Sequence, residues 1–230
     1  MRLHYLKDFF DLIFPRNCEL CGRNLYDFET DLCKICIGAL PKTVYHAIPY
    51  ENDLTDKIKG LTKTGMAMSF LRFTKEGQSQ KILHLLKYRN KPEIGTKVGK
   101  LYAQELIEAG LSTCWDTIVA VPLHPLKHQR RGYNQSEEFA KGISEGLNLP
   151  CYNYLERKKF TETQTKKSRI ERMDNVDEVF AIVSNKSVSG LRILLVDDVI
   201  TTGATLCSCA NVLLANGAKT VDLATIAAGK

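Results

Sequence analysis

The sequence predicts an α/β fold in which a mostly parallel sheet is flanked by helices and preceded by a small four-cysteine module. Two Cys-x-x-Cys pairs lie close together near the N-terminus. From about residue 66 onward, short apolar runs without polar alternation are separated by helical stretches. Apolar strands of this kind are typical of parallel sheets covered on both faces. The third observation is an apolar run, ILLV, followed directly by Asp-Asp and a loop of small residues.

The length and composition of the chain fit one large domain with a small appendage. Of its 230 residues, 44% are hydrophobic and 25% are charged, which excludes the disordered and fibrous classes. The net charge of +6 suits a protein that meets phosphates but does not establish nucleic-acid binding. Because no apolar run approaches the ~18 residues of a membrane-spanning helix, we expect a cytoplasmic protein without a membrane span.

The N-terminal segment has the pattern of a short amphipathic helix that ends at Pro15 and docks on the core of the protein. Charged residues interrupt its apolar stretch, which argues against a signal peptide. Association with a membrane surface is the alternative interpretation. The apolar residues that recur at helical spacing are Leu3, Leu6, Phe9, Phe10 and Ile13.

The four cysteines of CELC and CKIC, which are Cys18, Cys21, Cys33 and Cys36, predict a structural Zn²⁺ site. Two such knuckles supply four thiolates in tetrahedral reach of one ion, although the eleven-residue spacer is shorter than usual. Two redox pairs, or buried thiols without a metal, are the alternatives. A catalytic zinc is disfavoured because four thiolates leave no open position for water. We interpret the remaining cysteines as small core residues: Cys114, Cys151, Cys207 and Cys209.

The rest of the chain alternates between strands and helices, and we expect a domain boundary between residues 1–45 and 46–230. Pro92 and Gly110 bound one of the helices, and Asn134 is placed to cap another. In sheets of this class, ligands bind at the carboxyl ends of the strands. The expected strands cover 66–73, 117–122, 151–155, 179–183, 192–196 and 220–227, and the expected helices cover 79–90, 93–109, 134–147 and 205–215.

The stretch ILLVDDVITTGAT, residues 193–205, predicts a site for a phosphorylated sugar. Asp197 and Asp198 are expected to emerge side by side after the strand that ends at Val196, where two carboxylates can hold vicinal hydroxyls. The small residues 201–205 lead into a helix, whose first amide groups and dipole favour a phosphate. Gly203 allows close approach or a positive φ. The alternative is a loop that only caps a helix, with both aspartates solvated.

Several segments carry a resemblance to a known family. ILLVDDVITTGAT resembles the 5-phosphoribosyl 1-diphosphate (PRPP) motif of type I phosphoribosyltransferases. Three further segments are similar to the ComF/GntX family, in which a zinc ribbon precedes this fold: LLKYRNKPEIG, AVPLHPLKHQRRGYNQSEEFAKGI and TQTKKSRIERMDNVDEVF. The resemblance spans the chain from Cys18 to near the C-terminus and implies a type I phosphoribosyltransferase-like fold.

The resemblance also implies a role for each matching position. Asp197 and Asp198 would be the catalytic carboxylates, which hold the ribose hydroxyls, and Mg²⁺ would balance the charge of PRPP. The 5′-phosphate would bind to Thr201, Thr202, Gly203, Ala204 and Thr205. The pyrophosphate would bind to Val121, Pro122, Leu123 and His124, with Lys127, Arg130 and Arg131 nearby. A mobile loop over PRPP is expected at 161–175, with Lys166, Lys167, Arg169 and Arg172 available for phosphate or merely solvated.

The acceptor and the biological role remain open on the sequence. The variable region that selects an acceptor in this superfamily is expected in the zinc-bearing N-terminal part. One hypothesis is an enzyme that transfers phosphoribose to an unknown nucleophile. A second, implied by the ComF resemblance, is an accessory protein of DNA uptake in natural competence that binds single-stranded DNA or a helicase. A third is a regulator that senses PRPP. Acids interleaved with the basic residues argue against a dedicated DNA surface: Glu19, Asp27, Glu29, Asp31, Glu137, Glu138, Glu162 and Glu171.

Overall fold

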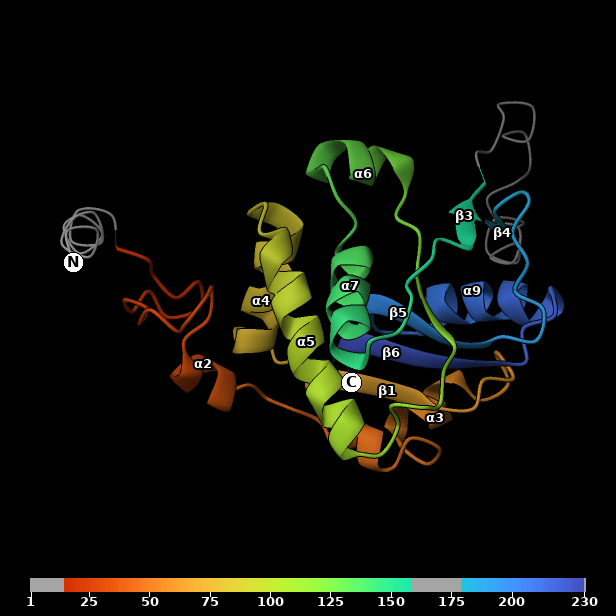
Figure 1. Cartoon of the computed structure of the whole chain (residues 1–230), viewed down its shortest axis with the longest axis horizontal. Helices are drawn as coiled ribbons and strands as arrows, with labels where there is room; N and C mark the ends of the chain where they lie inside the picture. The colour runs from red at the N-terminus through yellow and green to blue at the C-terminus, as the bar shows by residue number, and fades with distance from the viewer. Residues whose placement is uncertain (1–14, 159–178, 230) are drawn as a thin grey trace.

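The computed structural model describes residues 15–158 and 179–229 (Figure 1). The predicted N-terminal helix and the loop expected at 161–175 lie outside the described residues. In the part of the chain that is described, no helix is long and apolar enough to cross a membrane.

A four-stranded parallel sheet forms the centre of the fold (Figure 1). β5 and β6 are its two inner strands, and the apolar residues of β5 before Asp197 are fully buried. Burial on both faces explains why these runs lack the polar alternation of a half-exposed strand. The strand order is β1 (Ala67–Arg72), β6 (Thr220–Ala228), β5 (Arg192–Ile200) and β2 (Thr117–Ala120).

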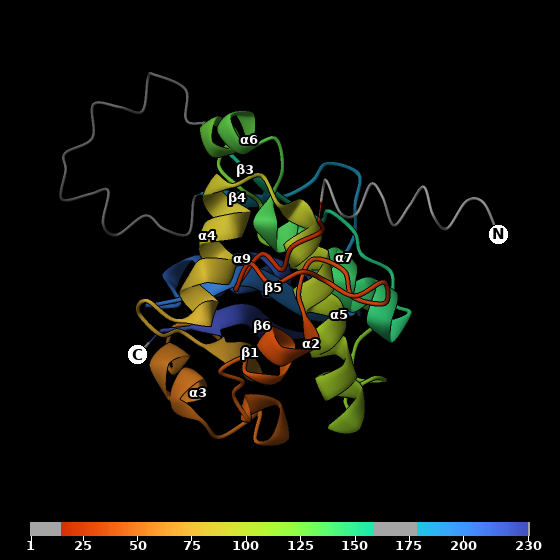
Figure 2. The same ribbon diagram turned by 90° about the vertical axis from the view of Figure 1, so that its left-hand side faces the viewer.

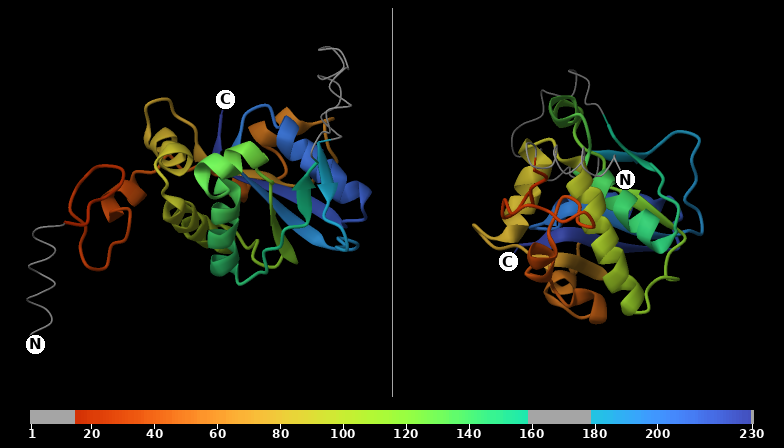
Figure 3. Two further views of the ribbon diagram at one scale, coloured as in Figure 1. Left: turned by 90° about the horizontal axis from the view of Figure 1, so that it is seen from above. Right: turned by 60° about the vertical axis from the view of Figure 1, so that its left-hand side comes forward.

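Helices cover both sides of the sheet, as Figures 2 and 3 show. α5 (Pro92–Glu108) packs against α7 (Gln135–Leu147), and α7 lies on β2 and β5. α9 (Ala204–Ala215) packs on β5 and β6 from the other side. α4 (Gln78–Tyr88) contacts α5 and lies beside the residues that follow the strands at their carboxyl ends. The predicted class, a helix-flanked parallel sheet, is confirmed.

Two glycines let α5 and α7 pack in direct backbone contact. A Cβ on Gly142 would overlap the carbonyl oxygen of Thr96, and one on Gly99 would overlap that of Phe139. Only a residue without a side chain permits this approach, although glycine lowers the stability of a helix by about 1 kcal/mol relative to alanine. The close packing sets the position of α7, whose first turn reaches the carboxyl end of β5.

The structure differs from the sequence-based expectation at two strands. The segment 151–155 is not a strand of the main sheet: Cys151 forms a single parallel bridge to Ile118, and β3 begins at Leu155. β3 (Leu155–Arg157) pairs antiparallel with β4 (Phe180–Ile182) as a separate two-stranded sheet. These runs are apolar because they pack at the edge of the core. A strand of the main sheet would show the same apolar pattern, so the pattern does not distinguish the two arrangements.

β5 is longer than predicted and runs through the acidic pair to Ile200. It can do so because β6 continues beside it as far as Ala228, so that Asp197 pairs with Thr225 and Ile200 with Ala228. The aspartates are therefore part of a hydrogen-bonded strand rather than the loop after it.

Within residues 15–158 and 179–229, four short helical segments were not expected from the sequence. The signals at α6 are the clearest in retrospect: Pro125 is its first residue, and Gly132 ends it with a φ of 79°. Proline at the first position and glycine after the last are common helix boundaries. The segments are α2 (Lys34–Gly38), the 3₁₀ turn η1 (Tyr45–Ala47), α3 (Asp53–Ile58) and α6 (Pro125–Arg131).

Candidate functional site

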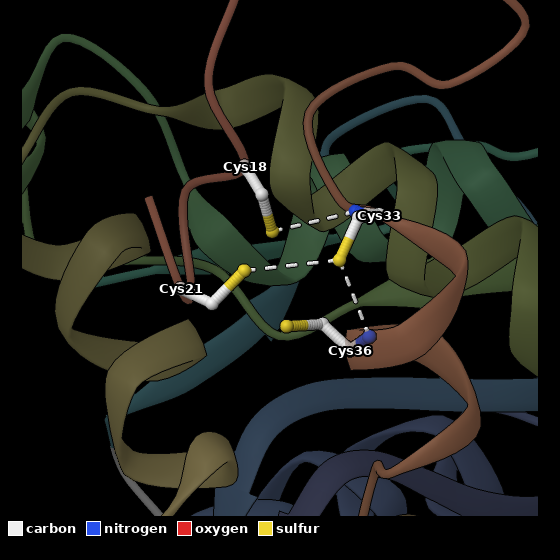
Figure 4. A group of neighbouring side chains, drawn as sticks. All are labelled: Cys18, Cys21, Cys33 and Cys36. Atoms are coloured by element: carbon white, nitrogen blue, oxygen red, sulfur yellow. Dashed lines mark hydrogen bonds between the residues drawn. The ribbon is translucent and has the colours of Figure 1, made fainter. Parts of the chain in front are cut away.

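The four predicted cysteine ligands converge on one point (Figure 4). Their sulfur atoms all lie within 4.8 Å of one another, and Cys21 Sγ is 3.8 Å from Cys33 Sγ. Three of the thiols are buried, whereas Cys21 is exposed. Burial opposes ionisation of Cys18, but hydrogen bonds from the amides of Cys33, Cys21 and Leu20 lower its pKa to about 7. The cluster has the donor set and the spacing of a four-coordinate metal site.

Glu29 holds the segment between the two cysteine pairs in place. Its buried carboxylate accepts hydrogen bonds from the amides of Lys34 at 2.8 Å and Tyr26 at 3.0 Å. Arg23 forms an ion pair with it at 3.2 Å. The two amide bonds and the nearby cations hold the pKa of Glu29 below its usual range. In the sequence Glu29 is one of several interleaved acids, and no local signal marks it as buried.

Asp197 occupies a fixed position near the carboxyl end of β5. The hydroxyl of Ser136 on α7 donates to Asp197 Oδ1 at 2.7 Å, and the amide of Asp198 donates to the same oxygen at 2.8 Å. Burial raises the pKa of Asp197 to about 7, and the negative charge of Asp198 adds to the effect. A carboxylate so placed is oriented before any ligand arrives and titrates in the neutral range.

Asp198 has a cationic partner that the sequence analysis did not identify. Lys87 Nζ, in the last turn of α4, lies 2.8 Å from Asp198 Oδ2. The two side chains are only 22% and 14% exposed. A signal for Lys87 was present, since it belongs to the LLKYRNKPEIG segment on which the family resemblance rests.

Residues 201–203 form a tight turn between β5 and α9, and Ala204 and Thr205 are the first residues of that helix. Gly203 has a φ of 81°, and α9 begins at the next residue, so the first amides of the helix face this turn. The side chain of Thr202 accepts a hydrogen bond from the amide of Ala204 at 3.4 Å. The turn surrounds a small hollow of about 50 Å³ that Asp197 also lines, and the three threonines are exposed. The amides and hydroxyls at this helix start are groups that can bind an anion, and they lie next to a carboxylate.

The predicted diphosphate residues fall into two groups. Residues 121–124 connect β2 to α6: the amide of Val121 donates to the carbonyl of Val196 at 2.9 Å, and the ring of His124 caps α6. Asn134, the N-cap of α7, holds the carbonyl of Val121 at 2.9 Å. The three predicted cations instead line a second hollow of about 740 Å³, with residues of α4 on its other side. This cationic hollow is lined by Lys87, Tyr88, Asn90, Lys127, Arg130, Arg131, Gly132 and Tyr133.

A third hollow of about 290 Å³ adjoins the other two and is mainly apolar. It shares Lys87 and Tyr88 with the cationic hollow, and Val199 and Thr201 with the turn. The residues that line it come from one face of α4 and from the ends of β1, β5 and β6: Phe73, Gln80, Leu83, His84, Lys87, Tyr88, Val199, Thr201 and Gly229. Among the described residues, none from the four-cysteine segment 17–38 lines any of these three hollows.

The fold and the site together define a class of protein: an α/β domain with an acidic pair, a phosphate-type turn and a cationic hollow at the carboxyl ends of parallel strands, as in phosphoribosyltransferases. Residues 86–230 match the phosphoribosyl transferase domain family, and the chain belongs to this family. The fold class expected from the PRPP-type motif is therefore confirmed.

Individual relatives refine the family assignment. DNA utilization protein YhgH of Salmonella typhi is 36% identical over 146 residues, which are 62% of this chain and 63% of that protein. Competence protein F of Haemophilus influenzae is 40% identical over 93 residues, 40% of this chain and 41% of that protein. Competence protein ComFC of Bacillus subtilis is 37% identical over 100 residues, 44% of this chain and 39% of that protein. The resemblance to the ComF family is confirmed.

The extent of these similarities is partial. The aligned part spans 63% of the length of the Salmonella relative. Among solved structures, a glutamine PRPP amidotransferase from B. subtilis, complexed with ADP and GMP, shares 25% identity at a TM-score of 0.40. The matched part covers 56% of this chain and 25% of the amidotransferase chain, and this similarity adds nothing to the family assignment.

Proposed function

We propose that the chain binds PRPP together with Mg²⁺ and that phosphoribosyl transfer is the reaction its site supports. The observation that carries the proposal is that three features of the site adjoin one another. Asp197 and Asp198 lie near the carboxyl end of β5, the phosphate-type turn begins at Thr201 after the strand ends at Ile200, and Lys87 connects Asp198 to the cationic hollow. A carboxylate pair, an anion cradle and a cluster of cations match the hydroxyls, the 5′-phosphate and the diphosphate of PRPP.

The proposed roles follow from the chemistry of each group. Asp197 and Asp198 bind the ribose hydroxyls, and the amides and hydroxyls of residues 201–205 bind the 5′-phosphate. Residues 121–124, with Lys127, Arg130 and Arg131, bind the diphosphate. Mg²⁺, when bound with PRPP, neutralises diphosphate charge and makes pyrophosphate a better leaving group. The orientation of Asp197 by Ser136 means that little reorganisation is needed when the ribose binds.

The test of PRPP binding is titration calorimetry with PRPP and Mg²⁺. We expect the wild type to bind and Asp198→Asn to bind at least about tenfold more weakly, since a charged hydrogen-bond acceptor contributes about 1.5–3 kcal/mol. Asp56→Asn is the control, because Asp56 is an exposed carboxylate on α3 and lines none of the three hollows. If the wild type does not bind PRPP, the site assignment is wrong.

A second measurement separates an enzyme from a binder. Pyrophosphate release is followed with PRPP and a panel of purine, pyrimidine and amine acceptors. Release that depends on one acceptor establishes a transferase. PRPP binding without release under every condition favours the alternative functions, a non-catalytic accessory protein or a regulator that senses PRPP.

We also propose that Cys18, Cys21, Cys33 and Cys36 bind a structural Zn²⁺ and that residues 1–45 form a module separate from 46–230. The convergent thiols support the metal site. Four thiolate ligands fill the tetrahedral shell of zinc, so the ion would stabilise this segment rather than take part in transfer.

We further propose a role in DNA handling in the cytoplasm, with single-stranded DNA or a helicase as the partner. The names of two relatives, a DNA utilization protein and a competence protein, support the link to DNA. In the four-cysteine segment, the exposed rings of Tyr26 and Phe28 stack on each other at 5.6 Å, with the cations of Arg23 and Lys34 over them at 5.4 and 4.5 Å. Acids in the same segment oppose contact with a phosphate backbone: Glu19, Asp27, Glu29 and Asp31. We therefore place any contact with a nucleic-acid backbone at the basic helix α6.

The test of DNA contact is fluorescence anisotropy with a single-stranded oligonucleotide over a salt series. Backbone contacts make the logarithm of the affinity fall linearly with the logarithm of the salt concentration. Arg130→Gln is expected to reduce the slope by about 0.7, the value for one phosphate contact on a single strand. A flat salt response would show that the chain makes no backbone contacts.

A further inference from the structure

Lys87 holds the central position among the groups of the proposed site. Its Nζ lies 2.8 Å from Asp198 Oδ2. Its side chain also lines the cationic hollow and the apolar hollow, so among the described residues it is the one charged residue common to both. α4 places it there as the penultimate residue of the helix, on the same face as Leu83 and His84.

The Lys87–Asp198 pair is not needed to hold α4 in place. The helix is anchored by Ile82, Leu83 and Leu86, which are at most 6% exposed. Those apolar contacts stabilise the docked helix far more than one partly exposed ion pair, whose contribution is typically about 1 kcal/mol or less. Lys87 is only 22% exposed and lies beside a proposed ribose-binding carboxylate, which favours a role in ligand binding.

Lys87 lies between two surroundings of opposite charge, the carboxylate of Asp198 and the cationic hollow. Asp198 is an acceptor that ribose hydroxyls would engage, whereas the cationic hollow already contains Lys127, Arg130 and Arg131. A lysine has three donors on a flexible four-carbon stem, so its ammonium group can contact Asp198 and a diphosphate oxygen at once, or exchange one for the other. Among the described residues that line the cationic hollow, Lys87 is the one paired with Asp198.

We propose that Lys87 is a specificity residue that makes the site favour a ribose 5-phosphate carrying a diphosphate at C1 over ribose 5-phosphate itself. The inference rests on the proposed function and deepens it. In the free protein the ammonium group is held on Asp198. In the complex it contacts the diphosphate and supplies a fourth positive charge to the cationic hollow, a contact that ribose 5-phosphate does not offer.

The experiment is calorimetry with Mg²⁺ and three ligands: PRPP, ribose 5-phosphate and inorganic pyrophosphate. We expect Lys87→Gln to weaken PRPP and pyrophosphate by about tenfold or more, and ribose 5-phosphate by less than about threefold. Lys87→Arg keeps the charge and is expected to retain most of the PRPP affinity. Lys87→Met provides a second uncharged variant, and thermal unfolding confirms that each variant is folded.

Lys91→Gln is the matched control. Lys91 lies four residues further along the same motif but pairs with Glu19 at 2.8 Å and lines none of the three hollows. Its replacement is expected to leave all three affinities unchanged.

The outcomes separate this inference from the proposed function. If the wild type binds neither PRPP nor ribose 5-phosphate, the proposed function fails and the inference with it. If the wild type binds both but Lys87→Gln weakens them by the same factor, Lys87 acts only as the counter-ion of Asp198 and the specificity role is wrong. A Lys87→Gln effect on PRPP that disappears in the Asp198→Asn background overturns the inference in the same way.

Discussion

The hydroxyl of Ser136, in the first turn of α7, donates a 2.7 Å hydrogen bond to Oδ1 of Asp197 on β5. The two residues are 61 positions apart in the chain, and the contact joins the segment that follows β2 to the acidic pair. The hydrogen bond orients the carboxylate of Asp197. Burial and the negative charge of Asp198 raise the pKa of this carboxylate to about 7. A buried acid is destabilising when ionised unless a ligand or a cation compensates it. Asp197 is therefore fixed in position, and its ionisation destabilises the folded protein when no ligand or cation compensates the charge.

Asp197→Asn is expected to stabilise the ligand-free protein at neutral and alkaline pH. The folded-state pKa of about 7 lies above the ordinary value of 3.8, so the folded protein retains a proton that the unfolded chain loses. The contribution of Asp197 to the stability of the wild type thus falls as the pH rises from about 4 to about 7 and is constant above that. The amide has no such cost, and we expect a gain in the free energy of unfolding of up to about 4 kcal/mol at pH 8. Urea unfolding at pH 5 and pH 8 measures it, and an equal effect at both pH values would contradict the prediction.

The pH dependence of PRPP binding follows from the same carboxyl group. Affinity is expected to rise between pH 6 and pH 8, as Asp197 loses its proton and becomes a full acceptor for ribose hydroxyls. Ser136→Ala removes a hydrogen bond that lowers the pKa of Asp197, so the rise is expected to move to higher pH. The control is Ser144→Ala in the last turn of α7, where the hydroxyl bonds the carbonyl of Leu149 instead. A pH midpoint that is the same in Ser136→Ala and the wild type would show that the bond does not tune Asp197.

The acidic pair and the turn could be predicted from the sequence because all their determinants are local. The apolar run, Asp197, Asp198 and residues 201–205 are contiguous, so the strand, the carboxylates and the helix start can be read together. The same holds for the four cysteines, whose spacing alone predicts that they converge.

Ser136 and Lys87 could not be assigned in the same way, because their roles arise from packing. Ser136 reaches Asp197 because α7 packs on β5, while Gly99 and Gly142 bring α5 and α7 into close contact. Lys87 reaches Asp198 only because α4 docks at the carboxyl ends of the strands. In the sequence both are ordinary polar residues on amphipathic helices, and a helical pattern indicates which face is buried but not which neighbour it meets.

Gly203→Ala is expected to reduce both stability and PRPP affinity. A φ of 81° is strained for alanine by roughly 1–2 kcal/mol. The new Cβ would also lie 2.9 Å from Cγ2 of Ile58, a buried residue of α3. Overpacking adds about 1 kcal/mol or more. Because the turn would have to shift, PRPP affinity should fall as well.

Gly110→Ala is the matched control for this substitution. Gly110 has a similar φ of 75°, but a Cβ there would meet nothing within 4 Å. It should show the conformational cost alone and an unchanged PRPP affinity. Thermal unfolding and calorimetry on both variants measure the difference, and equal losses would show that contact with Ile58 is unimportant.

Cys33→Ser is expected to remove zinc without disabling the proposed PRPP site. Cys33 is fully buried at the centre of the cysteine cluster, and serine can still accept the amide bond from Cys36 that begins α2. Loss of one thiolate leaves an incomplete tetrahedral shell, so the metal content should fall from about one equivalent to almost none. Cys114→Ser, at a half-exposed cysteine outside the cluster, should keep its zinc.

The consequence of zinc loss should be local, because none of the described residues 17–38 lines the three hollows at the strand ends. Limited proteolysis of Cys33→Ser should cut within 17–38, where metal coordination would otherwise hold the two cysteine pairs together. PRPP affinity should change by less than about threefold, because Asp197, Asp198 and Lys87 keep their partners on α4, α7 and β5. A much larger loss of PRPP affinity in the zinc-free variant would mean that the four-cysteine segment contributes to the ligand site after all, as the sequence analysis expected for the region that selects the acceptor.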